Sequence, residues 1–145
     1  MLPTELRALA LGLLSRREYT MAELKRRLGP HAPSPEALQE LLASLSEQGL
    51  LSDARAAEAL VRSRSRRQGS LLIEQELRRR GVEPQLLQDS LEQTRAAELA
   101  TALQILRKKF PTAPDSAEER ARQGRYLQNR GFPLAIIQQV LRAKD

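Results

Sequence analysis

Four arginines lie close together near the centre of the chain and offer the clearest chemistry in the sequence. This central arginine run consists of Arg62, Arg64, Arg66 and Arg67, and serines separate its first three members. A guanidinium group stays charged at physiological pH and presents a planar set of N–H donors that suits carboxylates and phosphates. The chemistry that the run offers is therefore recognition of an acidic partner.

Two interpretations of the central arginine run stay open from the sequence. Cations in the last turn of a helix stabilise its terminal carbonyls, and most charged runs are solvated surface. On a helical wheel Arg62 and Arg66 share one side, whereas Arg64 and Arg67 continue the apolar line of Leu60. Either that line runs out into solvent, or Arg64 folds its stem along it and pairs with a carboxylate. Both cases give cations that point in different directions and could contact a partner.

Other basic residues are concentrated at predicted helix ends. Positions 28 to 54 carry four acidic residues and no Lys or Arg, and positions 83 to 98 carry four acidic residues and one arginine. We predict that the central arginine run forms a basic patch for a partner or DNA together with nine further residues. These are Lys25, Arg26, Arg27, Arg78, Arg79, Arg80, Lys108, Lys109 and Arg130.

The residue types that usually perform catalysis are scarce. The chain has no cysteine, and its one histidine, His31, lies in a loop rich in Gly and Pro without a second ligand beside it. Thiolate nucleophiles, zinc sites and catalytic triads are therefore not expected. The sequence also contains no glycine-rich phosphate loop. We predict a protein that is not an enzyme, with no catalytic residue, no metal, no cofactor and no small-molecule substrate.

The composition predicts an all-α protein. Hydrophobic residues make up 41% of the 145 positions but aromatic residues only 3%, and the formal charge is +6. Leu, Ala, Arg, Gln and Glu dominate, and these residues lose little side-chain freedom in a helix. No apolar run approaches the roughly 20 residues that cross a bilayer. We therefore expect a cytoplasmic protein without a membrane partner.

Two stretches of the sequence match each other at an offset of 50 residues. "LRRRGVEPQLLQDSL" (77–91) aligns with "LQNRGFPLAIIQQVL" (127–141), and a third copy lies at 23–42 with a longer turn. Each copy predicts a helix, a glycine turn and a second helix. The expected left-handed turn residues are Gly29, Gly81 and Gly131, and the prolines at the next helix start are Pro35, Pro84 and Pro133.

A further amphipathic stretch precedes each copy, at about 4–16, 53–67 and 95–110. The chain is therefore predicted to form an elongated array of three tandem three-helix repeats, at 1–50, 51–93 and 94–145. A unit of this size buries little surface alone, so neighbours must pack end to end. The longest connection is expected at 110–120, with Asp115 or Ser116 as the N-cap of the next helix.

A glycine turn between short helices also describes the DNA-reading helix-turn-helix. There the second helix enters the major groove and faces phosphates. Here "PQLLQDSLEQ" (84–93) offers Asp89 and Glu92 and no cation, which argues against sequence-specific reading. Contact with the phosphate backbone alone stays open, as weak binding of single- or double-stranded DNA.

Several stretches, in order and over nearly the whole chain, resemble the RecX family of recombination regulators. They are "SRREYTMAELKRRL" (15–28), "LASLSEQGLLSDARAAEALVRSRSRRQGS" (42–70), "ELRRRGVEPQLLQDSL" (76–91), "ILRKKF" (105–110) and "YLQNRGFPLAIIQQVL" (126–141). The most specific part is G-L-L-x-D-x-R followed by V-R-S-R. The chain departs from the family at Ala56 and Leu60, where aromatic residues are usual.

The resemblance implies three three-helix repeats and no enzymatic activity. It also implies an inhibitor of RecA that takes part in DNA repair, homologous recombination and the SOS response. Such a regulator binds along the groove of the RecA–single-stranded-DNA filament and inhibits strand exchange, ATP hydrolysis and co-protease activity. We expect it to act as a monomer. The alternative is a helical protein that binds DNA independently of sequence through phosphate contacts.

Overall fold

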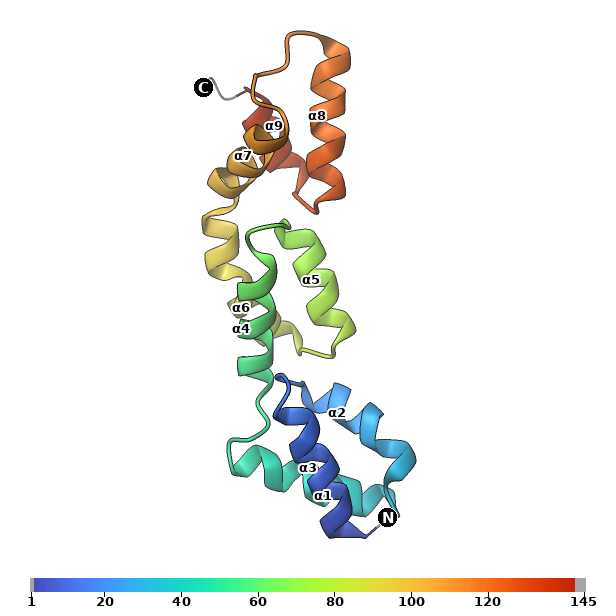
Figure 1. Cartoon of the computed structure of the whole chain (residues 1–145). Coiled ribbons are helices and arrows are strands. Elements are labelled where there is room, and N and C mark those ends of the chain that lie inside the picture. The colour runs from blue at the N-terminus through green and yellow to red at the C-terminus, as the bar shows by residue number, and fades with distance from the viewer. Residues whose placement is uncertain (1, 143–145) are drawn as a thin grey trace.

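The computed structural model describes residues 2–142, and every regular element within that range is a helix. The helices follow one another as three groups along an elongated column (Figure 1). The first group is α1 (Pro3–Leu14), α2 (Met21–Leu28) and α3 (Pro35–Glu47), with the short 3-10 helix η1 (Gly29–His31) between the last two. The second is α4 (Asp53–Arg64), α5 (Ser70–Arg79) and α6 (Pro84–Ala96), and the third is α7 (Glu98–Lys109), α8 (Ala117–Asn129) and α9 (Leu134–Arg142).

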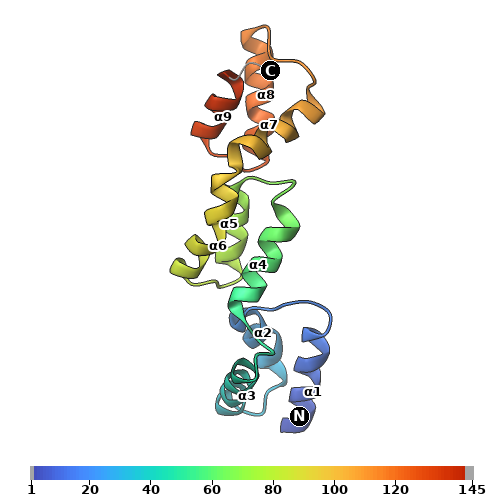
Figure 2. The ribbon, with the colours of Figure 1, turned by 90° about the vertical axis from the view of Figure 1, so that its left-hand side faces the viewer.

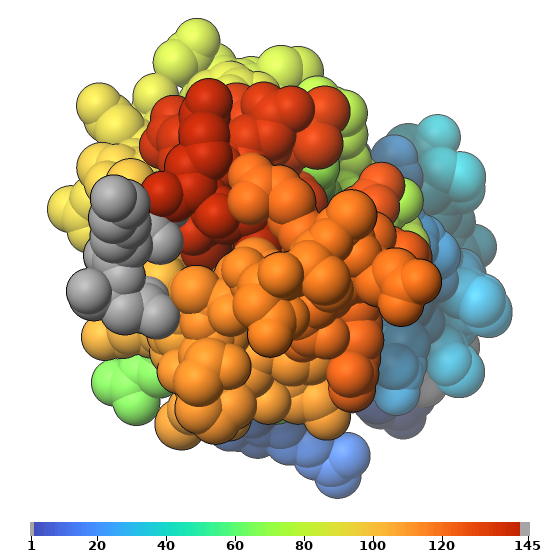
Figure 3. Space-filling model, turned by 90° about the horizontal axis from the view of Figure 1, so that it is seen from above, coloured from blue at the N-terminus to red at the C-terminus, as the bar shows by residue number. Residues whose placement is uncertain are grey.

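The predicted elongated array of three three-helix units is confirmed. The column keeps its length when it is turned by a quarter (Figure 2), and from its end the third unit lies over the other two (Figure 3). The units are therefore stacked and do not fold back on one another.

Each unit encloses its own small apolar core. Leu24, Leu42 and Leu45 are completely buried in the first core, which also includes Leu51. The second core is built mainly from α4, α5 and α6 and the third from α7, α8 and α9. Because cores of this size stabilise a unit only weakly, the contacts between units matter for the whole fold.

Prolines and side-chain caps mark the start of several helices. Pro35 and Pro84 are the first residues of α3 and α6, as predicted, whereas α9 begins one residue after Pro133. The Ser116 side chain accepts the Glu119 N–H at 3.0 Å, so Ser116 rather than Asp115 caps α8. Thr20, Ser34 and Ser52 cap α2, α3 and α4 in the same way.

The first helix of the middle unit is shorter than predicted, since it ends at Arg64 and not at residue 67. The Ser65 hydroxyl donates to the Val61 carbonyl, an alternative partner for the last turn of the helix. The Arg64 carbonyl then accepts the N–H groups of both Arg67 and Gln68 at 2.9 Å. Residues 65–69 therefore form a turn that leads into α5.

Two of the three predicted turn glycines adopt the left-handed conformation. Gly81 and Gly131 have φ angles of 84° and 90°, where residues with a side chain are strained. The prediction for Gly29 is wrong, because its φ is −48° and it continues into η1. The Ala32 N–H closes this extra turn on the Leu28 and Gly29 carbonyls.

The joint between units 1 and 2 places the start of α2 against the glycine turn of the middle unit. The Thr20 hydroxyl donates to the Arg80 carbonyl. The Met21 N–H donates to the Asp53 carboxylate at 2.7 Å, and a Cβ on Gly81 would lie only 2.5 Å from the Ala22 Cβ. The Arg55 and Glu18 side chains pair across the same joint at 3.1 Å.

The joint between units 2 and 3 repeats this arrangement at the start of α5. The Gly69 N–H donates to the Arg130 carbonyl at 2.7 Å, and the Leu71 N–H donates to the Gly131 carbonyl at 3.0 Å. The buried Glu98 carboxylate accepts the Ser70 N–H at 2.6 Å and the Ser70 hydroxyl at 2.8 Å. α5 has no side-chain cap and no acid in its own first turn, so Glu98 supplies the missing acceptor.

Gly131→Ala tests the close packing at the second joint. A Cβ there would meet the Leu72 side chain at 2.5 Å and its backbone nitrogen at 2.9 Å, on a residue with φ of 90°. We expect a loss of about 2–4 kcal/mol in the free energy of unfolding, from left-handed strain and overpacking. Urea unfolding followed by circular dichroism measures it. Gly12→Ala, in an open helical position, is the control and should stabilise by about 0.5–1 kcal/mol. Equal stability of the two variants would contradict the close packing.

Glu98→Ala tests the acceptor at the start of α5. The change leaves the Ser70 N–H and hydroxyl buried without this partner, so we expect a loss of about 2–4 kcal/mol in the free energy of unfolding. Glu98→Gln, which keeps the shape and one acceptor oxygen, should lose less. Glu40→Ala on the exposed surface of α3 is the control and should change the stability by less than about 0.5 kcal/mol. A loss for Glu98→Ala as small as that of the control would contradict this role.

Candidate partner interface

The central arginine run lies at the end of α4, next to the third unit. Arg62 is exposed and pairs with Glu58 at 3.3 Å, and the Arg67 guanidinium donates to the Ser63 carbonyl at 3.2 Å. The Arg64 side chain is half-buried, but within residues 2–142 it forms no ion pair with a carboxylate. The side chain is therefore partly covered, as one of the two alternatives predicted, but no carboxylate of residues 2–142 pairs with it.

The second predicted arginine group lies at the opposite end of the middle unit. Arg78 and Arg79 lie in the last turn of α5 and Arg80 is its C-cap, about 15 Å along the helix from Ser70. Arg78 pairs with Glu74 at 2.9 Å, and Arg79 and Arg80 pair with Glu76 at 2.7 and 3.0 Å. The central arginine run and the arginines at positions 78–80 therefore form two separate groups. The charge of the second group is partly neutralised by glutamates of the same helix.

The second joint brings together basic residues that lie far apart in the sequence. Arg66 and Lys108 line one open hollow over α7, with Ser65, Thr101, Gln104, Ile105 and Arg107. The Arg130 guanidinium donates to the Arg67 carbonyl at 3.3 Å and lies 5.2 Å from the centre of the Tyr126 ring. We call Arg66, Arg67, Lys108 and Arg130 the joint cluster. It is the only set of predicted site residues from both the second and third units that these contacts bring together in the described structure.

The remaining predicted residues lie apart from the joint cluster or at its margin. Lys25, Arg26 and Arg27 are exposed in the last turn of α2, in the first unit, and Lys109 is exposed at the end of α7. In the described part of the chain, these four side chains have no ion-pair partner. They are available to a partner without first breaking an internal contact.

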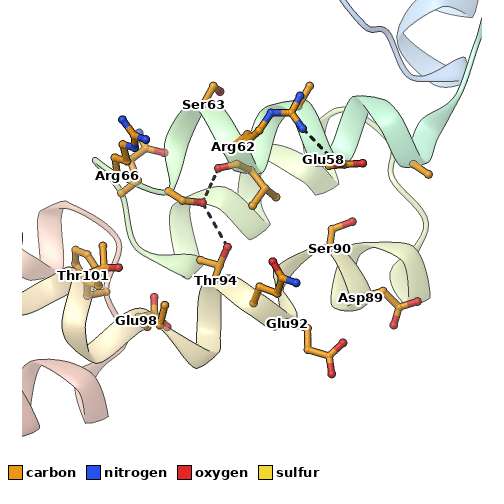
Figure 4. A pocket seen from close by; sticks show the side chains of 18 residues that line it. Glu58, Arg62, Ser63, Arg66, Asp89, Ser90, Glu92, Thr94, Glu98 and Thr101 are labelled. Carbon is orange, nitrogen blue, oxygen red and sulfur yellow. Dashed lines mark hydrogen bonds and ion pairs between the residues drawn. The ribbon is translucent and has the colours of Figure 1, made fainter.

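A groove beside the joint cluster was not predicted from the sequence. It has a volume of about 1010 Å³ and lies between α4, α6 and the start of α7 (Figure 4). Arg62 and Arg66 lie along the α4 side, whereas Asp89 and Glu92 project from α6. The packing of α4 against α6 creates this groove, and no local sequence signal reports which residues of the two helices will face each other.

The lining of the groove is acidic although the chain is basic. Four carboxylates line it, from Glu58, Asp89, Glu92 and Glu98, against two guanidinium groups, from Arg62 and Arg66. The whole chain has a formal charge of +6. The two arginines that the sequence assigned to a basic patch therefore border an acidic surface on one side.

Residues 2–142 contain no group of three or more His, Asp or Glu side chains arranged to hold a metal ion. Over the same range, no helix is both long and apolar enough to cross a membrane.

Comparisons with known proteins agree on one family. Residues 52–91 match the family model "RecX, second three-helix domain" and residues 96–141 match "RecX, third three-helix domain". "Regulatory protein RecX" of Leptothrix cholodnii is 39% identical over 97% of this chain and 89% of its own length. The protein of the same description from Chromobacterium violaceum is 43% identical over 94% of this chain and 88% of its own.

The fold is also similar to solved structures. The crystal structure of RecX from Lactobacillus salivarius superposes with a TM-score of 0.85, covering 96% of this chain and 94% of that one, at 19% identity. A second crystal structure, of a "regulatory protein RecX", gives a TM-score of 0.80 over 95% of this chain and 72% of that chain, at 21% identity.

The ion pairs at the end of α5 predict a pH-dependent contribution to stability. Burial alone would raise the pKa of Glu76, but hydrogen bonds from Arg79 and Arg80 outweigh it and hold the pKa below its ordinary value. A carboxyl group with a lowered pKa in the folded state stabilises the fold above its unfolded pKa of about 4.3. That contribution is lost as the pH falls through the folded pKa.

We expect Glu76→Gln to be less stable than the unsubstituted protein near pH 7, and this difference to shrink as the pH falls toward about 3. The difference near neutrality should be no more than about 1 kcal/mol, because Arg79 is largely exposed. Urea unfolding at a series of pH values measures it. Glu58→Gln, which removes the pair with Arg62 in which both side chains are largely exposed, is the control and should show little difference at any pH. A difference for Glu76→Gln that does not change with pH would contradict the role of these pairs.

Proposed function

The chain belongs to the RecX family of regulatory proteins, and we propose that it regulates RecA by binding the RecA–single-stranded-DNA filament in its groove. Bound there, it inhibits the recombinase, ATPase and co-protease activities of the filament. The proposed site of action is the cytoplasm, where the filament assembles on DNA. The protein acts as a monomer and without a catalytic step of its own.

The observation that carries this proposal is the stacked array with its two joints. Main-chain and buried carboxylate hydrogen bonds fix each unit on the next, as at Gly69 and Ser70. A long array of fixed units can follow the groove of a helical filament and touch more than one protomer. Many weak contacts then act together, because binding of one unit raises the effective concentration of the next.

The joint cluster is the proposed main electropositive contact of the array. Its members come from the turn after α4, from α7 and from the C-cap of α8, so it exists only when units 2 and 3 are stacked. The exposed cations at Lys25, Arg26, Arg27 and Lys109 add further contacts. The arginines at the end of α5 contribute less, since Glu74 and Glu76 already neutralise them in part.

A double charge reversal in the joint cluster tests its role. We expect Arg66→Glu with Lys108→Glu to raise the concentration for half-maximal inhibition at least tenfold, which corresponds to about 1.4 kcal/mol. The measurement is suppression of DNA-stimulated ATP hydrolysis by preformed RecA filaments. The matched control is Arg16→Glu with Arg125→Glu, the same change in charge at exposed positions outside the cluster. A folded joint-cluster variant that inhibits as well as this control would contradict the assignment.

The exposed cations also favour the alternative, sequence-independent binding of DNA phosphates. Salt separates the two functions, because binding through phosphates weakens steeply as the salt concentration rises. We expect inhibition of the filament by substoichiometric amounts of the protein to persist at a salt concentration that abolishes its binding to naked DNA. Parallel loss of both would favour the alternative.

A further inference from the structure

The acidic groove between α4 and α6 is a poor match for nucleic acid. Asp89, Glu92 and the exposed Glu58 lie along it, and the buried Glu98 closes the end next to unit 3 (Figure 4). Phosphates placed there would approach carboxylates from several directions, and a partly covered site strengthens such repulsion. The groove therefore has a different partner chemistry from the joint cluster beside it.

The floor of the groove suits the close approach of a polypeptide. Small side chains form it, with Ser65 and Thr94 3.4 Å apart across the two helices and Ala97 and Thr101 beyond them. Val61 adds a partly buried apolar surface. The amide side chains of Gln68 and Gln93 can donate to or accept from main-chain groups of a bound segment.

The charges on the two sides of the groove determine which charges a bound segment must carry. On the α6 side, neither Asp89 nor Glu92 forms an ion pair within residues 2–142, and the Asp89 carboxylate accepts only the Gln85 amide, at 2.9 Å. On the α4 side, the Arg62 pair with Glu58 is largely exposed and can exchange its partner at little cost. Complementary charges are thus a cation facing α6 and a carboxylate facing α4.

We propose that this groove binds a polypeptide segment of the protein component of the filament, with Lys or Arg against Asp89 and Glu92 and an acidic side chain against Arg62. This inference rests on the proposed function, because it assigns the protein contact of the same array. Protein and phosphate then meet the array on neighbouring but different surfaces. The groove sets which protein is bound, and the joint cluster adds affinity through charge.

Charge reversal on α6 distinguishes a protein segment from DNA by the direction of the effect. We expect Asp89→Lys with Glu92→Lys to raise the concentration for half-maximal inhibition of RecA filaments at least tenfold. The same change makes the surface more basic, so binding to naked DNA should be unchanged or stronger. Stronger inhibition by this variant would overturn the proposal, since it would mean that the groove meets phosphates.

A matched control comes from α3, where Glu36 and Glu40 are also exposed. Glu36→Lys with Glu40→Lys makes the same change in charge, and we expect it to inhibit like the unsubstituted protein. Circular dichroism and urea unfolding confirm that both variants are folded. Equal weakening of inhibition by both variants would overturn the assignment to the groove.

Site-specific crosslinking identifies the occupant directly, because the natural chain has no cysteine. Gln93→Cys carries a photoreactive maleimide into the groove, and Gln39→Cys on exposed α3 is the control. We expect irradiation with RecA filaments on single-stranded DNA to link the Gln93→Cys protein to RecA. Attachment to DNA alone, or equal attachment to RecA from both positions, would overturn the proposal.

The unsubstituted protein separates the two levels of inference. If it inhibits the filament while the α6 variant inhibits equally well and position 93 does not crosslink to RecA, only the groove assignment fails. If it neither binds nor inhibits RecA filaments, the proposed function itself fails.

Discussion

The structure depends on hydrogen bonds between the start of a helix in one unit and acceptors in the next unit. The first N–H groups of a helix have no acceptor within it. At both joints, a carboxylate at the start of the next unit's first helix, Asp53 or Glu98, accepts one of these donors. A carbonyl beside a left-handed glycine accepts a further donor at each joint: the Arg80 carbonyl accepts the Thr20 hydroxyl, and the Arg130 carbonyl accepts the Gly69 N–H. Because each core is small, these polar contacts and the glycine packing decide whether three units form one body.

The joint between units 2 and 3 also determines where the acidic groove and the joint cluster lie. Glu98 locks α7 onto the start of α5 and also closes one end of the acidic groove. Arg130 is the C-cap residue of α8 and donates to the Arg67 carbonyl. This hydrogen bond connects the members of the joint cluster from the two units. A basic chain can therefore present an acidic groove and a basic cluster side by side, since the stacking of units and not the local sequence decides which charges become neighbours. The net charge of the chain therefore does not indicate that an acidic groove is present.

The helices and their stacking could be predicted because they rest on local signals. The hydroxyl at Ser116 and the left-handed glycines at 81 and 131 behave as their residue types require. Gly29 does not, because the Gly-Pro pair continues as a 3-10 turn, which the repeat alignment could not reveal. The ion pair of Arg78 with Glu74 could have been predicted, because residues four positions apart on a helix lie on the same face. The meeting of Arg66 with Lys108 was not, since 42 positions separate them and only the folded joint brings them together.

The two connections between units differ in length, and this has a mechanical consequence. Only Ala97 separates α6 from α7, whereas residues 48–52 separate α3 from α4. A single residue between two helices has few dihedral angles to change, and a five-residue connection can absorb rotation. The angle between the second and third units is therefore set by the chain itself. The angle between the first and second units is set by the contacts of the first joint, such as that of Met21 with Asp53.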